Sequence, residues 1–129
     1  MENTNIDATE NRPGGDRKID SAVLLIDLPA FIKQIKDEKA WDQNDRNAIT
    51  VFKTDKMRIV LVALHRKATM QTEHPENIIS VQVLKGKISV ATNYASTEVD
   101  KEMMLALHEK VPYTITASKK SIFLLTVVE

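Results

Sequence analysis

From residue 48 to its carboxyl end, the chain is a series of short segments rich in Val, Ile, Leu and Thr. These segments are residues 48–53, 57–65, 77–84, 87–92, 103–107, 113–116 and 121–128. Turn-forming or charged residues separate them, such as Lys85-Gly86 and residues 118–120. Closely spaced short strands of this kind predict a β-sandwich or barrel, and they argue against alternating strands and helices.

One amphipathic helix is predicted before these strands, over about residues 28–40. Its apolar residues follow the i, i+3, i+4, i+7 spacing of a single helix face and are Leu28, Phe31, Ile32 and Ile35. Asp27 is a typical N-cap, and Pro29 is tolerated in the first turn. The apolar run 22–26 just before the helix is predicted to be a short strand. Trp41 is predicted to anchor the helix end to the sheet, with ligand stacking as the alternative.

Length and composition favour one domain preceded by a tail. The chain has 129 residues, which suits a single domain. Residues 1–18 are polar, contain an Arg-Pro-Gly-Gly turn signal and have few apolar side chains. Such a segment buries too little surface to offset its ordering entropy, so it is predicted to be a mobile tail. The domain itself is expected to span residues 19–129.

Charge and cysteine content exclude several classes of function. Eighteen basic and eighteen acidic residues give a net charge of zero, which argues against broad binding to nucleic acid or to an anionic membrane. No apolar run is long enough for a membrane span, and the amino terminus does not look like a signal peptide. With no cysteine there is no disulfide, thiolate zinc site or cysteine nucleophile. We therefore expect a cytoplasmic protein.

The order of segments resembles that of the small single-domain cupins. The resemblance is carried by the strand 57–65, by His74, by a strand that ends at Gly86 and opens a hairpin, and by the final pair 113–117 and 121–125. It implies a mainly β, cupin-type jelly-roll barrel with one amino-terminal amphipathic helix. It also implies a homodimer. The run at residues 22–26 and the carboxy-terminal strand are the segments expected to contribute to its interface.

The same resemblance places the metal-binding positions of the family on four residues of this chain. They are Thr72, His74, Ile79 and Tyr113, of which only His74 keeps its ligand type. A catalytic metal needs about three protein ligands that converge on one point. The chain thus departs from the metal site of the family, and this departure argues against a bound metal or other cofactor. If a metal does bind, His74 and Tyr113 are its expected ligands.

A small-molecule pocket is the expected use of the barrel interior. Its candidate residues are Thr72, His74, Ile79, Val81 and Tyr113, which combine a few polar groups with an apolar wall. A filled barrel with no cavity would use the same residues, and the sequence does not separate the two outcomes. His65 and His108 end and begin segments, so they are expected at surfaces or rims.

We therefore predict a non-catalytic small-molecule-binding or sensory module. No Gly-x-Ser-x-Gly elbow occurs, and three glycines are too few for a glycine-rich phosphate loop. One alternative is a metal-dependent cupin enzyme of oxygenase or isomerase type, in which His65 or His108 joins His74 and Tyr113. A second alternative is a structural protein that acts through its dimer surface. The ligand itself is not predicted.

Overall fold

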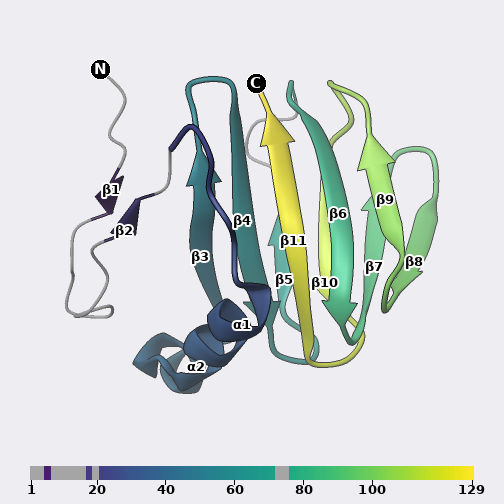
Figure 1. Cartoon of the computed structure of the whole chain (residues 1–129). Helices are drawn as coiled ribbons and strands as arrows, with labels where there is room; N and C mark the ends of the chain where they lie inside the picture. Colours follow the sequence, from purple (N-terminus) through teal and green to yellow (C-terminus); the bar gives the residue numbers. More distant parts are fainter. Residues whose placement is uncertain (1–4, 7–16, 19–20, 72–75) are drawn as a thin grey trace.

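The computed structural model describes residues 5–6, 17–18, 21–71 and 76–129, and it places two antiparallel sheets face to face (Figure 1). The five-stranded sheet has the order β3-β4-β11-β6-β9. Its strands are β3 Arg46–Lys53, β4 Met57–Leu64, β11 Ser121–Val128, β6 Ile78–Lys85 and β9 Met104–Leu107. The four-stranded sheet has the order β5-β10-β7-β8. Its strands are β5 Thr69–Gln71, β10 Tyr113–Ala117, β7 Lys87–Thr92 and β8 Ser96–Asp100.

The chain crosses repeatedly between the two sheets, which is the topology of a jelly roll. From β4 it passes to β5 in the other sheet, returns to β6, and passes again to β7 and β8. It then returns to β9, crosses to β10 and ends in β11, at the centre of the five-stranded sheet. Strands far apart in sequence are therefore neighbours. Phe123 of β11, for example, lies opposite Val62 of β4 on one side and Val83 of β6 on the other.

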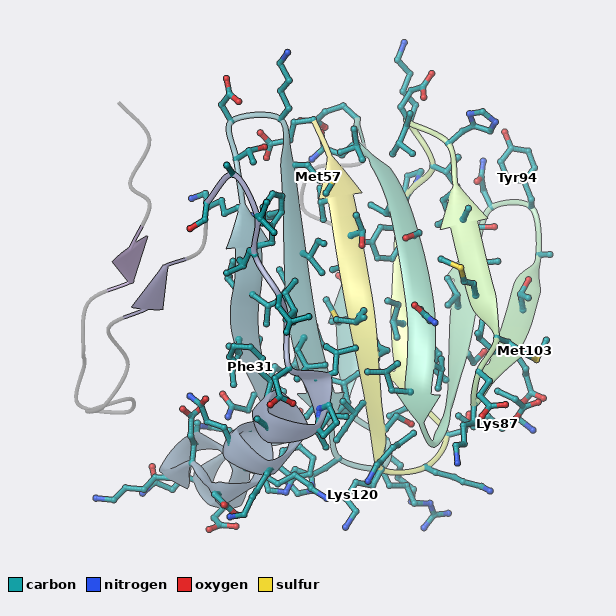
Figure 2. All side chains as sticks on the ribbon, in the orientation of Figure 1. Phe31, Met57, Lys87, Tyr94, Met103 and Lys120 are labelled. Carbon is teal, nitrogen blue, oxygen red and sulfur yellow. The ribbon has the colours of Figure 1, made fainter. Side chains whose placement is uncertain are left out.

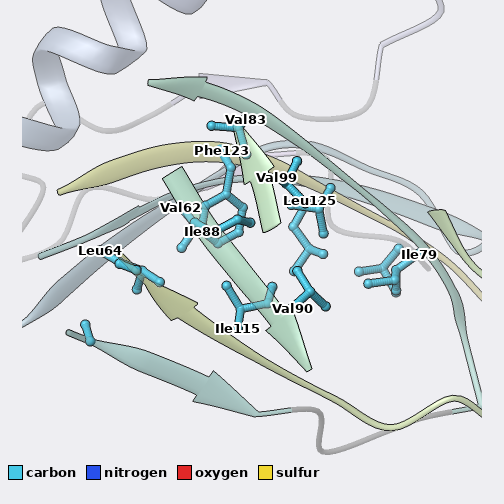
Figure 3. Close-up of a cluster of buried hydrophobic side chains, with 14 residues drawn as sticks. Val62, Leu64, Ile79, Val83, Ile88, Val90, Val99, Ile115, Phe123 and Leu125 are labelled. Atoms are coloured by element: carbon cyan, nitrogen blue, oxygen red, sulfur yellow. The ribbon is translucent and has the colours of Figure 1, made fainter. Parts of the chain in front are cut away.

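An inner core fills the space between the sheets (Figure 3). Alternate residues of the strands point inward, as expected for sheets buried on one face. The inner core consists of Val62, Leu64, Ala68, Ile79, Val81, Val83, Ile88, Val90, Val99, Ile115, Ala117, Phe123, Leu125 and Val127. Its largest fully buried side chain is Phe123. These side chains pack together at the centre of the barrel.

An outer core lies on the opposite face of the five-stranded sheet, beneath helices α1 (Leu28–Asp37) and α2 (Lys39–Gln43). Ile35 of α1 is fully buried against Ile49, Leu61 and other residues of this face. The Asp27 side chain accepts a hydrogen bond from the Ala30 amide (3.1 Å), which confirms the predicted N-cap. Of the predicted apolar stripe, Phe31, Ile32 and Ile35 thus pack on the sheet.

Two polar contacts fix the helices to the strands. The buried Asn47 side chain donates hydrogen bonds to the Ile35 carbonyl and to the Glu38 carboxylate, both at 3.0 Å. Trp41 is buried and stacks on His65, with ring centroids 3.5 Å apart, and its carbonyl accepts a hydrogen bond from His65 Nε2 (2.7 Å). Trp41 therefore anchors α2 to the end of β4, as predicted, and is not free to stack on a ligand.

The structure corrects several boundaries. Residues 22–26 form no strand but an extended segment over the outer face of the five-stranded sheet (Figure 1). The single helix predicted over 28–40 is two helices, and Trp41 lies within the second. Strands β5 and β8 were not predicted. Within the predicted tail, β1 (Asn5–Ile6) and β2 (Arg17–Lys18) form a two-stranded ladder.

No helix in the described part of the chain is long and apolar enough to cross a membrane.

Candidate functional site

The predicted pocket residues that the structure describes all lie on inner faces of the barrel. Ile79 and Val81 project from β6 into the inner core and are buried. Tyr113 begins β10, is half-buried and packs against the same core. Thr72 and His74 lie outside the described residues. The described part of the predicted apolar wall, Ile79 and Val81, is thus packed into the inner core.

The described donor groups do not fit a catalytic metal. Ile79 has no donor atom, and no group of three or more His, Asp or Glu side chains converges anywhere in residues 21–71 and 76–129. His65 is held on Trp41, on the helix side of the five-stranded sheet. The His108 side chain is 93% exposed, with Glu109 as its nearest carboxylate at 3.9 Å. His108 thus lies at the surface, as expected, whereas His65 is half-buried against Trp41.

A hollow opens beside the filled interior, where the edges of the two sheets face each other. Its volume is about 350 Å³. It is lined by residues of β7, β8, β9 and the loops next to them, namely Val90, Thr92, Tyr94, Ala95, Thr97, Leu105, Ala106, Leu107, His108 and Val111. We call this space the edge hollow. Figure 2 shows Tyr94 on the hairpin between β7 and β8, at the end of the molecule away from the helices.

The edge hollow lies one strand away from the predicted pocket. Leu107 is the cross-strand partner of Ile79, and Thr92 is the partner of Tyr113. Of the predicted pocket residues that the structure describes, Ile79, Val81 and Tyr113, none lines this space, whereas His108, a ligand in the enzyme alternative, does. The sequence contains only a partial signal for it. Thr97 and Val99 lie on the same, inward-facing side of β8, because alternate residues of a strand share a face. A polar residue at an inward-facing position is the one feature of the sequence that points to this hollow.

The lining of the edge hollow is chiefly apolar. Val90 is fully buried at its base, and the half-buried Leu105 and Leu107 form the wall from β9. The polar lining groups are the hydroxyls of Thr92, Thr97 and Tyr94 and the His108 imidazole. An apolar wall with a few polar groups is the usual composition of a small-molecule site.

The groups with shifted pKa values lie elsewhere. A hydrogen bond to Glu98 and the nearby charge of Asp100 raise the pKa of Lys87, at the start of β7. The Arg46 guanidinium, 2.8 Å from the Asp45 carboxylate, lowers the pKa of that carboxyl beside the helices. Among the described residues, no Asp, Glu, Lys or Arg lines the edge hollow. The described lining therefore offers no carboxylate for acid–base catalysis.

A second hollow of about 320 Å³ is more open and more polar. It is lined by Gln71, Ala91, Thr92, Pro112, Tyr113 and Thr114, so it includes one predicted pocket residue. Thr114 lies on the outer face of the four-stranded sheet, opposite Gln71 and Ala91. This second hollow is a shallow surface depression and lacks the apolar wall of the edge hollow.

Comparison with known proteins shows likeness in structure and not in sequence. No family model and no curated protein matches the chain. A conserved protein of unknown function from Streptococcus pyogenes matches over 96% of each chain, with 15% identity and a TM-score of 0.65. A cupin superfamily protein from Desulfitobacterium hafniense matches over 66% of this chain and 78% of its own, with 13% identity and a TM-score of 0.62.

An enzyme is also among the similar structures. Salicylate 1,2-dioxygenase from Pseudoaminobacter salicylatoxidans matches with a TM-score of 0.58 and 18% identity, over 65% of this chain and 25% of the enzyme. At such identities the likeness concerns the fold. The described part of the chain is a cupin-type jelly-roll barrel with an amino-terminal helical segment.

Proposed function

We propose that the protein is a non-catalytic binding module for small organic molecules, that the edge hollow holds the ligand, and that it works in the cytoplasm. The observation that carries this proposal is the hollow itself, a space of about 350 Å³ that lies against an apolar wall beside the packed inner core. Ligand sites generally have volumes of about 300–1,000 Å³ and a few polar groups, and the edge hollow falls in that range. In this proposal Ile79, Val81 and Tyr113 support the wall from behind, and Thr72 and His74 remain candidates for further contacts.

Blocking the hollow should abolish ligand-induced stabilisation. Thr97 is exposed and faces the space, so Thr97→Phe adds a ring there without displacing buried side chains. In a thermal-unfolding screen of small organic compounds, ligands at about 100 times their Kd should stabilise the wild type by about 2.7 kcal/mol, and the variant much less.

The matched control is Ser96→Phe. Ser96 neighbours Thr97 on β8 but faces outward, with its hydroxyl 3.2 Å from that of Ser89. This variant should keep the ligand response. A screen without any stabilising compound, or equal responses in both variants, would refute the edge hollow as the binding site.

The enzyme alternative requires a bound metal. The similar dioxygenase structure keeps this alternative open at the level of the fold, whereas the described donor groups speak against it. Elemental mass spectrometry of protein purified without a histidine tag should find only trace transition metal. Near-stoichiometric iron, manganese, nickel, copper or zinc that is lost in His74→Ala would instead favour the enzyme.

We also propose that the chain forms a homodimer through its outer apolar face. Val23 and Leu25 are 89% and 92% exposed on the extended segment before α1, and Met104, Ile78 and Val128 are exposed on the same sheet or at its end. Val128 and Ile78 are cross-strand partners, so these two exposed side chains adjoin each other, and exposed apolar patches are typical of interaction surfaces.

A single charge should disrupt this pairing. Leu25→Glu is expected to convert a dimer to a monomer in sedimentation velocity at micromolar concentration, because an unpaired carboxylate is costly to bury. Thr69→Glu places the same charge on the outer face of the other sheet and should leave the dimer intact. A monomeric wild type would contradict the proposal.

A further inference from the structure

We infer that the edge hollow takes an uncharged, mostly apolar molecule of about two fused rings, whose one polar group hydrogen-bonds to the Thr97 hydroxyl. This inference names the ligand class of the proposed function and therefore rests on it. It follows from three properties of the hollow: its size, the absence of Asp, Glu, Lys and Arg from its described lining, and the inward-facing Thr97 hydroxyl, which has no hydrogen-bond partner among the described residues.

The size sets the dimensions of the ligand. An apolar cavity of about 150 Å³ is enough to bind benzene. The edge hollow, at about 350 Å³, has room for a second ring. Val90 at the base and Leu105 and Leu107 in the wall present only aliphatic carbon to a flat molecule. A ring system would also lose little conformational entropy on binding.

The charges of the lining exclude strongly ionic ligands. No lysine, arginine, aspartate or glutamate of the described chain lines the space. An ionised ligand would lose its hydration at the apolar wall without gaining a fixed counter-charge, which is costly. His108 lines the rim but is 93% exposed, so its imidazole remains in water.

The hydroxyls of the lining are not equivalent. Thr92 is occupied in its own turn, because its oxygen accepts from the Tyr94 and Ala95 amides (3.1 and 3.2 Å) and its proton points to the Ala95 carbonyl (3.2 Å). Tyr94 is 80% exposed. Thr97 lies on β8 opposite Val90, and its hydroxyl has no hydrogen-bond partner among the described residues. It is the polar group best placed to bind a ligand held against Val90.

Matched naphthalene probes test the inference on the full chain. By titration calorimetry at a pH of about 7.5, where 2-naphthol is protonated and 2-naphthoate is ionised, we expect 2-naphthol to bind with Kd on the order of 0.1 mM. Naphthoate should bind at least about tenfold more weakly. Thr97→Val keeps the side-chain shape and removes the hydroxyl, so it should weaken 2-naphthol about five-fold and leave naphthalene unchanged.

The outcomes separate the ligand class from the proposed function. Naphthoate binding as tightly as 2-naphthol, with both lost in Thr97→Phe, would overturn the ligand class and leave the binding function standing. If 2-naphthol does not bind, the ligand class is also wrong. The proposed binding function is then tested by the thermal-unfolding screen of other small organic compounds. Binding of both probes that Thr97→Phe does not affect would overturn both proposals.

Discussion

Replacing Gly86 with alanine is expected to reduce the free energy of unfolding by about 2–5 kcal/mol. Gly86 joins β6 to β7 with a φ of +84°, a conformation that costs an alanine about 1–2 kcal/mol. A Cβ atom there would also press against the Lys120 carbonyl oxygen and the Ser121 hydroxyl. Lys120 ends the turn between β10 and β11, and Ser121 is the first residue of β11, so the substitution would push the β6–β7 turn away from the start of β11.

The contact, more than the φ value, makes this position special. Lys67, Glu102 and Lys110 also have positive φ values and are exposed, which shows that the fold tolerates side chains in this conformation where space is free. At Gly86 the neighbouring Ser121 is fully buried. Its oxygen accepts from the Lys87 amide (2.9 Å) and lies 2.7 Å from the Lys119 carbonyl.

Urea unfolding followed by circular dichroism measures the effect. Lys85→Ala, at the exposed neighbouring residue, is the control and should change stability by less than about 0.5 kcal/mol. Ser121→Ala should not rescue Gly86→Ala, because the Lys120 carbonyl remains in place and the buried hydrogen bonds are lost. A Gly86→Ala variant as stable as the wild type would contradict the close approach of Gly86 to Lys120 and Ser121.

Phe123→Ala is expected to destabilise the protein by about 3–5 kcal/mol. Phe123 has no exposed surface and lies in the middle of β11, between Val62 and Val83. Its ring spans the space between the sheets, so its removal loses burial and leaves a cavity that the barrel closes only partly.

The control for this substitution is Phe123→Leu, which keeps much of the volume and should cost less than about 1.5 kcal/mol. Both variants are measured by urea unfolding with unchanged m-values. A cost of less than about 1 kcal/mol for Phe123→Ala would mean that the interior is loosely packed at its centre. The hollow would then extend through the barrel and would no longer be confined to the edge.

The strands that the sequence predicts well are those with several inward-facing apolar residues. The bounds predicted for β7 and β11 agree with the structure, because each strand carries a clear apolar row between turn residues. Strands β5 and β8 were missed. Each contributes one inward apolar side chain to the inner core, Met70 or Val99, and their other residues are polar.

At residues 22–26 a strand was predicted that the structure does not contain. The composition of this segment is apolar enough for a strand, yet the segment pairs with none in the described structure. Ile26 packs on the outer core, while Val23 and Leu25 point away from it. Composition indicates burial or association, and only the sheet topology decides whether backbone pairing is possible.

The candidate site was the hardest part to predict. The inward faces of Ile79, Val81 and Tyr113 follow from strand alternation. Whether a space remains beside them depends on how side chains from distant segments fill the gap between two sheet edges. Val90, Thr97 and Leu107 meet there only in three dimensions, and their individual positions along the chain contain no signal that the gap stays open.

The most direct test of the proposed binding function is a map of amide chemical-shift changes on adding 2-naphthol to the isotopically labelled protein. The edge hollow predicts saturable shifts that centre on Val90, Thr97, Leu105 and Leu107, and that disappear in Thr97→Phe. Absence of saturable shifts, or shifts centred on Gln71 and Thr114 at the second hollow, would contradict this account of the site.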